Sequence, residues 1–174
     1  IASNVISGLS VMTVGPGDEC LSFLPLSHIF ERTGGHYEMM HAGAVINYAG
    51  SIDTVSADMQ ARKPTCMLSV PRLYEKIYAR VLESALSGSP VKKQIFFWAK
   101  RNGETYAEYT LAGKPVPRAL ALKHRIGDRL VFSKLRERTG GRLRFFISGG
   151  APLSAEIAKF FFAAGLPILD GYGL

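Results

Sequence analysis

Five short apolar runs alternate with helical patterns along this chain of 174 residues. Each run has the length of a buried strand, and each is followed within two residues by proline or glycine. Strands separated by helices need crossover connections, which are typical of parallel sheets. The sequence therefore predicts an α/β fold, with a mostly parallel sheet flanked by helices. The predicted strands are Cys20–Leu24, Ala44–Tyr48, Thr65–Val70, Leu143–Ile147 and Leu166–Leu169.

Helical patterns fill the intervals between these runs. The clearest covers Arg72–Leu86, where Leu73, Ile77 and Val81 recur every four residues and charged residues occupy the outer face. Residues 91–142 form a basic segment with two further helical patterns. We expect this segment to be a helical excursion between two strands.

Two glycine-rich turns, Ser148–Leu153 and Asp170–Gly173, each follow a predicted strand directly. In open parallel sheets, ligands bind at the carboxyl ends of the strands. Consecutive glycines let backbone N–H groups face a ligand, and Tyr172 between two glycines suits stacking on a flat base. Each turn could equally be structural, because a Gly-Gly pair often forms a simple tight turn and a tyrosine can close the edge of a core. The chain contains no standard phosphate-loop fingerprint.

His28 follows the first predicted strand and Pro25, at a junction between strand and helix. A histidine at such a junction can face a ligand, or it can bond local carbonyl groups in the first turn of a helix. The sequence around His28 does not decide between these two roles.

Hydrophobic residues make up 47% of the chain and charged residues 20%, which is ordinary for a globular domain with one core. The net charge of +7 is uneven, because residues 92–144 hold 14 of the 21 Lys and Arg but only four acids, a net +10. This segment could attract phosphates, an anionic membrane or nucleic acid, or it could be an ordinary solvated surface. Contiguous Phe96, Phe97 and Trp98 resemble helix core, so we do not expect nucleic-acid binding.

Cys20 and Cys66 each lie inside an apolar run, which predicts buried free thiols in a reducing compartment. The chain has no Cys-x-x-Cys pair and no close His/Cys cluster, so we expect no metal site within it. No apolar run approaches the roughly 20 residues that span a bilayer. These features predict a cytoplasmic protein that is either dissolved or peripheral to a membrane.

Four short sequence motifs, which include the features described above, together resemble those of a known family. They are PLSHIFER at 25–32, PRLYEK at 71–76, SGGAPL at 148–153 and DGYGL at 170–174. In this order and spacing, they closely resemble the long-chain fatty-acid–CoA ligases, which are acyl-CoA synthetases of the adenylate-forming, AMP-binding superfamily. The resemblance covers almost the whole chain, and the HIFER string is similar to the long-chain branch.

The resemblance implies that residues 1–174 are an internal fragment of the N-terminal domain of such an enzyme. Relatives use ATP and Mg²⁺ to convert a fatty acid into an acyl-adenylate, and then transfer the acyl group to coenzyme A. The family's phosphate loop, metal ligand and C-terminal domain would lie outside this chain. We therefore expect the isolated chain to lack ligase activity, and to self-associate through faces that other segments would cover.

The matching strings also imply roles for individual residues. His28 would be the catalytic-site residue that places the reacting carboxylate, by orientation rather than by proton transfer. Phe30 and Gly149 would border the acyl channel together with His28. The nucleotide-binding residues would be Gly149, Gly150, Ala151, Pro152, Asp170, Gly171, Tyr172 and Gly173, with Asp170 near the adenine amine and Tyr172 against the adenine face.

Two other interpretations stay open. Another adenylate-forming, acyl-activating enzyme would share most of these strings. A generic nucleotide-binding α/β module, such as half of a dehydrogenase, should carry a glycine fingerprint after its first strand, whereas this chain has Pro25 there. In the preferred interpretation, the partners are a fatty acid and a nucleotide.

Overall fold

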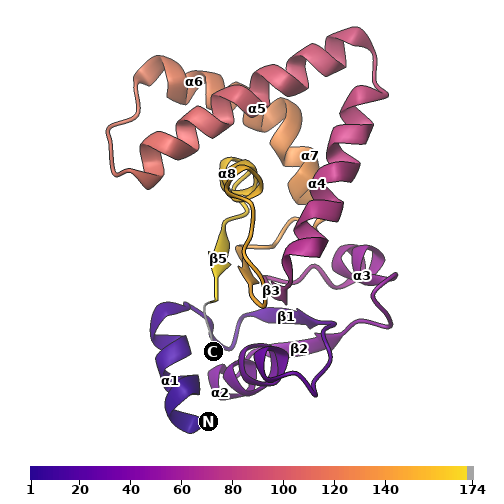
Figure 1. Ribbon diagram of the computed structural model, residues 1–174, viewed down its shortest axis with the longest axis vertical. Helices are drawn as coiled ribbons and strands as arrows, with labels where there is room; N and C mark the ends of the chain where they lie inside the picture. Colours follow the sequence, from indigo (N-terminus) through magenta and orange to yellow (C-terminus); the bar gives the residue numbers. More distant parts are fainter. Residues whose placement is uncertain (172–174) are drawn as a thin grey trace.

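A sheet of five parallel strands lies at the centre of the protein, for which the computed structural model describes residues 1–171 (Figure 1). The strands lie in the order β2-β1-β3-β4-β5, and every neighbouring pair is parallel. The predicted α/β fold with a parallel sheet is therefore confirmed. The strands are β1 (Glu19–Ser22), β2 (Val45–Tyr48), β3 (Cys66–Ser69), β4 (Phe145–Ser148) and β5 (Ile168–Asp170).

Both faces of the three central strands, β1, β3 and β4, are buried. Leu21, Met67 and Phe146 belong to the larger apolar cluster, whereas Cys20 and Cys66 belong to a smaller cluster. Successive side chains of a strand point to opposite faces, so these neighbours in sequence separate into two cores. Parallel sheets need this double coverage, which explains why the strands are continuous apolar runs rather than alternating ones.

Helices form layers on the two faces of the sheet (Figure 1). The layer beside the smaller cluster contains α1 (Ala2–Val11), the π-helix η1 (Glu31–Glu38) and α2 (Met39–Ala42). The layer beside the larger cluster contains α3 (Val55–Arg62), α4 (Pro71–Leu86), α7 (Ser133–Arg138) and α8 (Ala155–Ala163). Outside α8 lie α5 (Pro90–Leu111), α6 (Arg118–Gly127) and the π-helix η2 (Asp128–Phe132).

Two tyrosines anchor α4: Tyr74 contacts the sheet, and Tyr78 contacts α8. Tyr74 and Tyr78 are the buried aromatic residues of this helix, and the aliphatic stripe that reveals the helix in the sequence is only partly buried around them. The Tyr74 hydroxyl donates to the Ile147 carbonyl oxygen at 2.9 Å, and its ring lies 5.2 Å from that of Phe146. A buried tyrosine needs such an acceptor. The bond fixes the first turns of α4 beside the carboxyl end of β4.

The basic segment packs as a helical hairpin at the end of the molecule farthest from β1 and β2 (Figure 1). His124 of α6 stacks on Tyr106 of α5 with 4.0 Å between ring centroids, and its Nε2 lies 2.8 Å from the Ala163 carbonyl oxygen in α8. Phe96 is buried but Phe97 is 36% exposed. Only part of the aromatic triplet therefore belongs to the core.

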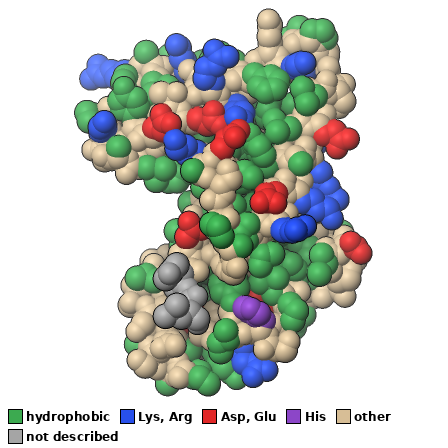
Figure 2. Space-filling view, viewed as in Figure 1, with side chains coloured by type: hydrophobic (Ala, Val, Ile, Leu, Met, Phe, Trp, Pro, Cys, Tyr) green, Lys and Arg blue, Asp and Glu red, His purple; other side chains and the backbone are tan. Residues whose placement is uncertain are grey.

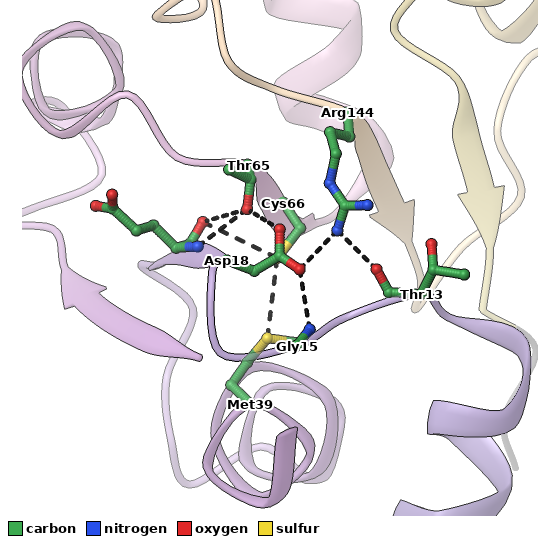
Figure 3. Close-up of polar contacts among 8 residues, drawn as sticks. Thr13, Gly15, Asp18, Met39, Thr65, Cys66 and Arg144 are labelled. Atoms are coloured by element: carbon green, nitrogen blue, oxygen red, sulfur yellow. Dashed lines mark hydrogen bonds and ion pairs between the residues drawn. The ribbon is translucent and has the colours of Figure 1, made fainter. Parts of the chain in front are cut away.

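A polar cluster ties the strands together at the amino end of the sheet (Figure 3). The Asp18 carboxylate accepts hydrogen bonds from the Thr65 hydroxyl at 2.7 Å, the Gly15 amide at 2.9 Å and the Arg144 guanidinium at 2.7 Å. Burial opposes ionisation of Asp18, but these three partners together lower the pKa of its carboxyl. This cluster lies at the edge opposite to the carboxyl ends of the strands.

Cys20 and Cys66 are paired in register on neighbouring strands, and both are buried free thiols as predicted. The neighbouring Cys66 thiol and burial both raise the pKa of Cys20. Cys20 is therefore a core residue without the accessible thiolate that reactive cysteines need.

Candidate functional site

Four strands end in a polar residue at the carboxyl edge of the sheet. Ser69, Ser148 and Asp170 are register partners at the ends of β3, β4 and β5, and Ser22 ends β1. The Ser148 hydroxyl is buried and has no hydrogen-bond partner among the described residues. An unpaired buried hydroxyl is costly, and a ligand that bonded it would remove that cost.

A cavity of about 530 Å³ opens above this edge. Three segments that are far apart in the sequence form its walls: the loop between β1 and η1, the start of α4, and the glycine-rich loop after β4. The lining residues are Leu24, Pro25, His28, Phe30, Val70, Pro71, Arg72, Glu75, Gly150, Ala151 and Pro152. The volume is typical of a pocket for a small molecule. The cavity thus joins three of the four strings that carry the family resemblance.

His28 is held by its own loop. Its amide donates to the Pro25 carbonyl oxygen at 2.9 Å, and its carbonyl oxygen accepts from the Arg32 amide at 3.0 Å. The imidazole Nδ1 accepts from the Phe30 amide at 3.2 Å. A neutral histidine that accepts at Nδ1 carries its proton on Nε2. The exposed His28 ring therefore offers one N–H donor at the wall of the cavity.

Phe30 lies against two glycines. A Cβ atom placed on Gly149 would be 2.8 Å from Cε2 and Cζ of the Phe30 ring, and one on Gly171 would be 3.4 Å from Cε2. The Gly171 amide also donates to the Ser148 carbonyl oxygen at 2.7 Å. The ends of β4 and β5 thus form a glycine floor that lets an aromatic ring approach the backbone.

The predicted nucleotide-binding residues are only partly brought together. Gly150, with a φ of 81°, lines the cavity with Ala151 and Pro152. Asp170 is exposed at the end of β5 and is not among the residues that line the cavity. Tyr172 and Gly173 lie outside the described residues. Of the predicted nucleotide-binding residues, the cavity therefore brings together Gly150, Ala151 and Pro152.

Arg72 and Glu75 also line the cavity, on the first turns of α4. Our sequence analysis gave them no role, although they lie within the PRLYEK string. The helix begins with Pro71 at its first position, where the missing amide hydrogen costs nothing. The amino end of α4 and the Arg72 guanidinium bring positive charge to this wall of the cavity, and the Glu75 side chain brings a negative charge to the same wall.

A buried carboxyl group supports the helix that follows His28. Glu31 is fully buried, its Oε1 accepts from the Ser22 hydroxyl at 2.5 Å, and its Oε2 has no partner among the described residues. Burial raises the pKa of Glu31 to about 7, although the Ser22 hydrogen bond acts in the opposite direction. Glu38, at the other end of η1, also has a pKa raised to about 7 by burial. The burial of Glu31 and Glu38 could not be predicted from sequence, because charged residues are normally exposed.

The family described as "AMP-binding enzyme" matches residues 1–174. The chain belongs to this family. The match covers all four strings, and the structure brings residues of three of them to the cavity at the carboxyl edge of the sheet.

Several relatives of this chain are long-chain fatty-acid–CoA ligases by name. This chain is 36% identical over 158 residues to long-chain-fatty-acid–CoA ligase FadD15 of Mycobacterium tuberculosis. The match covers 91% of this chain and 26% of that relative. The chain is 37% identical to the peroxisomal long chain acyl-CoA synthetase 6 of Arabidopsis thaliana, over 90% of the chain and 21% of that relative. It is 32% identical to long-chain-fatty-acid–CoA ligase 3 of Saccharomyces cerevisiae, over 98% of the chain and 24% of that relative. The chain thus spans about a quarter of these relatives.

Solved structures share the fold. The adenylation domain of a carboxylate reductase from Mycobacterium chelonae superposes with a TM-score of 0.68 at 23% identity, covering 99% of this chain and 23% of the other. The N-terminal domain of FACL13 from Mycobacterium tuberculosis gives a TM-score of 0.58 at 18% identity, covering 98% of this chain and 30% of the other. At these identities, the likeness concerns the fold alone.

Within residues 1–171, no three His, Cys, Asp or Glu side chains are grouped so that they could hold a metal ion. In the same part of the chain, no helix combines the length and the apolar character needed to cross a bilayer.

Proposed function

We propose that this chain is part of an ATP-dependent fatty-acid–CoA ligase that acts on long-chain fatty acids. The observation that carries the proposal is the cavity that joins His28, Phe30 and the Gly150–Pro152 loop. The proposed substrate class, long-chain fatty acids, comes from the names of the relatives. In this proposal, residues 1–174 are part of a larger N-terminal domain, Mg²⁺ accompanies ATP and is held outside the chain, and coenzyme A accepts the acyl group.

The proposed reaction has two steps. A carboxylate oxygen of the fatty acid forms a bond to the α-phosphorus of ATP, and pyrophosphate leaves with the electrons of the broken P–O bond. The thiol of coenzyme A then attacks the acyl carbon, loses its proton, and releases AMP. A carboxylate is already a competent nucleophile, so the protein contributes position and charge neutralisation rather than a general base.

His28 has a specific role in this scheme. Its Nε2–H would donate to the carboxylate oxygen that does not attack, which orients the other oxygen. Because Nδ1 accepts from the Phe30 amide, the ring is fixed in the tautomer that this role needs. The amino end of α4 and Arg72 would offset negative charge at the same wall of the cavity.

The acyl and nucleotide subsites follow from the floor of the cavity. Phe30 over Gly149 would border the acyl chain beside His28. Gly149–Pro152 would line the adenine pocket, with Asp170 near the adenine amine and Tyr172 against the adenine face, and Gly171 and Gly173 would shape that turn. An adenylate-forming enzyme for other acids is the main alternative. Exchange of labelled pyrophosphate into ATP by the full-length protein, with a panel of acids, separates the two: long-chain fatty acids should support exchange, and aromatic or amino acids should not.

We also propose that α6 makes peripheral contact with an anionic membrane surface. Exposed Leu122, Ile126 and Leu130 recur every four residues along α6 and η2, with exposure of 60%, 43% and 47%, and exposed Lys123, Arg125 and Arg129 lie among them. In one view of the protein, Lys and Arg side chains gather over this hairpin (Figure 2). We further propose that the isolated chain self-associates through apolar faces that other segments of a longer protein would cover.

The membrane contact predicts salt-sensitive binding of the full-length protein to vesicles that contain anionic lipid. Each basic residue near such a surface contributes about 1 kcal/mol. The double variant Lys123→Glu/Arg125→Glu should therefore bind about tenfold more weakly or worse in a vesicle sedimentation assay at low salt. Equal binding to neutral vesicles at every salt concentration would contradict the contact.

A further inference from the structure

A second cavity, of about 250 Å³, lies in the helical layer and shares no lining residue with the candidate site. It opens between α4, the first turns of α5, and the η2–α7 segment. Its floor is made of Phe96, Phe132, Leu135 and Phe160, which are 0–5% exposed. The floor is therefore a dry, apolar surface formed by the larger core itself.

Three basic side chains surround this floor. Lys92 of α5 and Lys134 and Arg138 of α7 line the cavity, and all three are exposed. No acidic residue lines it, and none of the three forms an ion pair with a described side chain. Other cations of the basic segment do have partners: Lys100 pairs with Glu104 at 2.8 Å and Arg136 with Asp128. The positive charge at the cavity is thus left uncompensated.

We propose that this cavity binds a single-chain anionic amphiphile, with the end of its alkyl chain on the aromatic floor and its head group among Lys92, Lys134 and Arg138. The apolar floor selects a hydrocarbon, because each buried methylene contributes about 0.8 kcal/mol. The unpaired cations select a negative head group. The volume is below the roughly 300–1,000 Å³ of ordinary ligand pockets, which favours one chain end over a bulky ligand. This site is separate from the proposed catalytic cavity and does not depend on the proposed ligase activity.

The head group could be the carboxylate of a free fatty acid or the phosphate of a single-chain phospholipid. Both place negative charge at the end of one alkyl chain. A segment of a longer chain, or a second copy of this one, could also cover the apolar floor. The following experiment distinguishes all of these.

The test is photolabelling of the full-length protein with dodecanoate that carries a diazirine at its chain end, with ATP and coenzyme A absent. Peptides of α4, α5 and α7 that line the cavity should be labelled, and labelling should fall about tenfold or more in Lys134→Glu/Arg138→Glu. The matched control Lys76→Glu/Arg80→Glu carries the same change of charge on exposed positions of α4, outside the cavity, and should change labelling less than about twofold.

Two further arms complete the test. Unlabelled dodecanoate and lysophosphatidate should compete, and the stronger competitor identifies the head group, whereas dodecanol should compete far less. Ala85→Phe, which places a ring in the cavity from α4, should abolish labelling even if the charge variant is poorly folded. Three outcomes would overturn the proposal. The α4, α5 and α7 peptides could stay unlabelled because another segment or copy covers the cavity. The charge variant could be labelled as strongly as the control, or dodecanol could compete as well as dodecanoate. Labelling at the candidate site is measured on peptides that carry its own lining residues. Labelling of the second cavity therefore does not depend on whether the protein has ligase activity.

Discussion

Gly149→Ala is expected to reduce fatty-acid-dependent pyrophosphate exchange by the full-length protein about tenfold or more. The added Cβ would lie 2.8 Å from two carbon atoms of the Phe30 ring, which is closer than carbon atoms pack. The ring must therefore move, and it forms part of the wall of the candidate cavity. Overpacking of this kind costs about 1–3 kcal/mol, and 1.36 kcal/mol of lost transition-state stabilisation corresponds to tenfold in rate.

A double-mutant cycle identifies the cause of this loss. Phe30→Leu removes the ring atoms that the new methyl group would meet, so Gly149→Ala should cost much less in that background, with a coupling of about 1 kcal/mol or more. Gly17→Ala is the matched control, because a Cβ at Gly17 meets no atom within 4 Å. Exchange that is unchanged in Gly149→Ala, or an equal cost with and without the Phe30 ring, would show that the contact does not shape the site.

The buried carboxyl group of Glu31 should make the η1 helix less stable as the pH rises. Its folded pKa, about 7, is above the value of about 4.3 expected in an unfolded chain. The folded state therefore holds the proton more tightly, and stability present below pH 4.3 is lost as the pH rises toward 7 and above. The shift corresponds to about 4 kcal/mol at most. Glu31→Gln keeps an oxygen for the Ser22 hydroxyl and has no proton to lose.

Hydrogen exchange of peptides that cover η1 tests this prediction. When variant and wild type are compared at the same pH, the intrinsic pH dependence of exchange cancels. Glu31→Gln should exchange up to about 100-fold more slowly than wild type at pH 8, and at nearly the same rate at about pH 4, below the unfolded pKa. Glu83→Gln, an exposed substitution on α4, should change neither. Faster exchange of Glu31→Gln at pH 8 would mean that the wild-type carboxylate is ionised and stabilised in the fold.

The sequence predicted the sheet well because its strands are short apolar runs that proline or glycine closes. The same rule located the turn after β4, and the recurrence of apolar residues every four positions located the clearest helix, α4. The π-helix η1 was harder, because its sequence ERTGGHYE carries two buried acids and two glycines instead of an apolar stripe. Close packing explains this composition: a Cβ on Gly34 would lie 2.5 Å from Cδ2 of Leu68 in β3. A helix that packs through its backbone leaves little hydrophobic pattern.

The candidate site was predictable in its parts but not in its contacts. His28 and the Gly150 loop could be named because each follows a strand at the carboxyl edge. The packing of Phe30 on Gly149 joins residues far apart in the sequence, and no local pattern reveals such a contact. For the same reason, Arg72 received no role, since its place in the cavity depends on how α4 packs on β4.

Exchange of labelled pyrophosphate into ATP by the full-length protein, with and without palmitate, tests the central claim most directly. Wild type should exchange only when the fatty acid is present. His28→Ala should lower that exchange about 100-fold, because the carboxylate loses its orienting donor. His41→Ala, which changes an exposed histidine outside the cavity, should exchange like wild type. No fatty-acid-dependent exchange in the wild type, or full exchange in His28→Ala, would contradict the account.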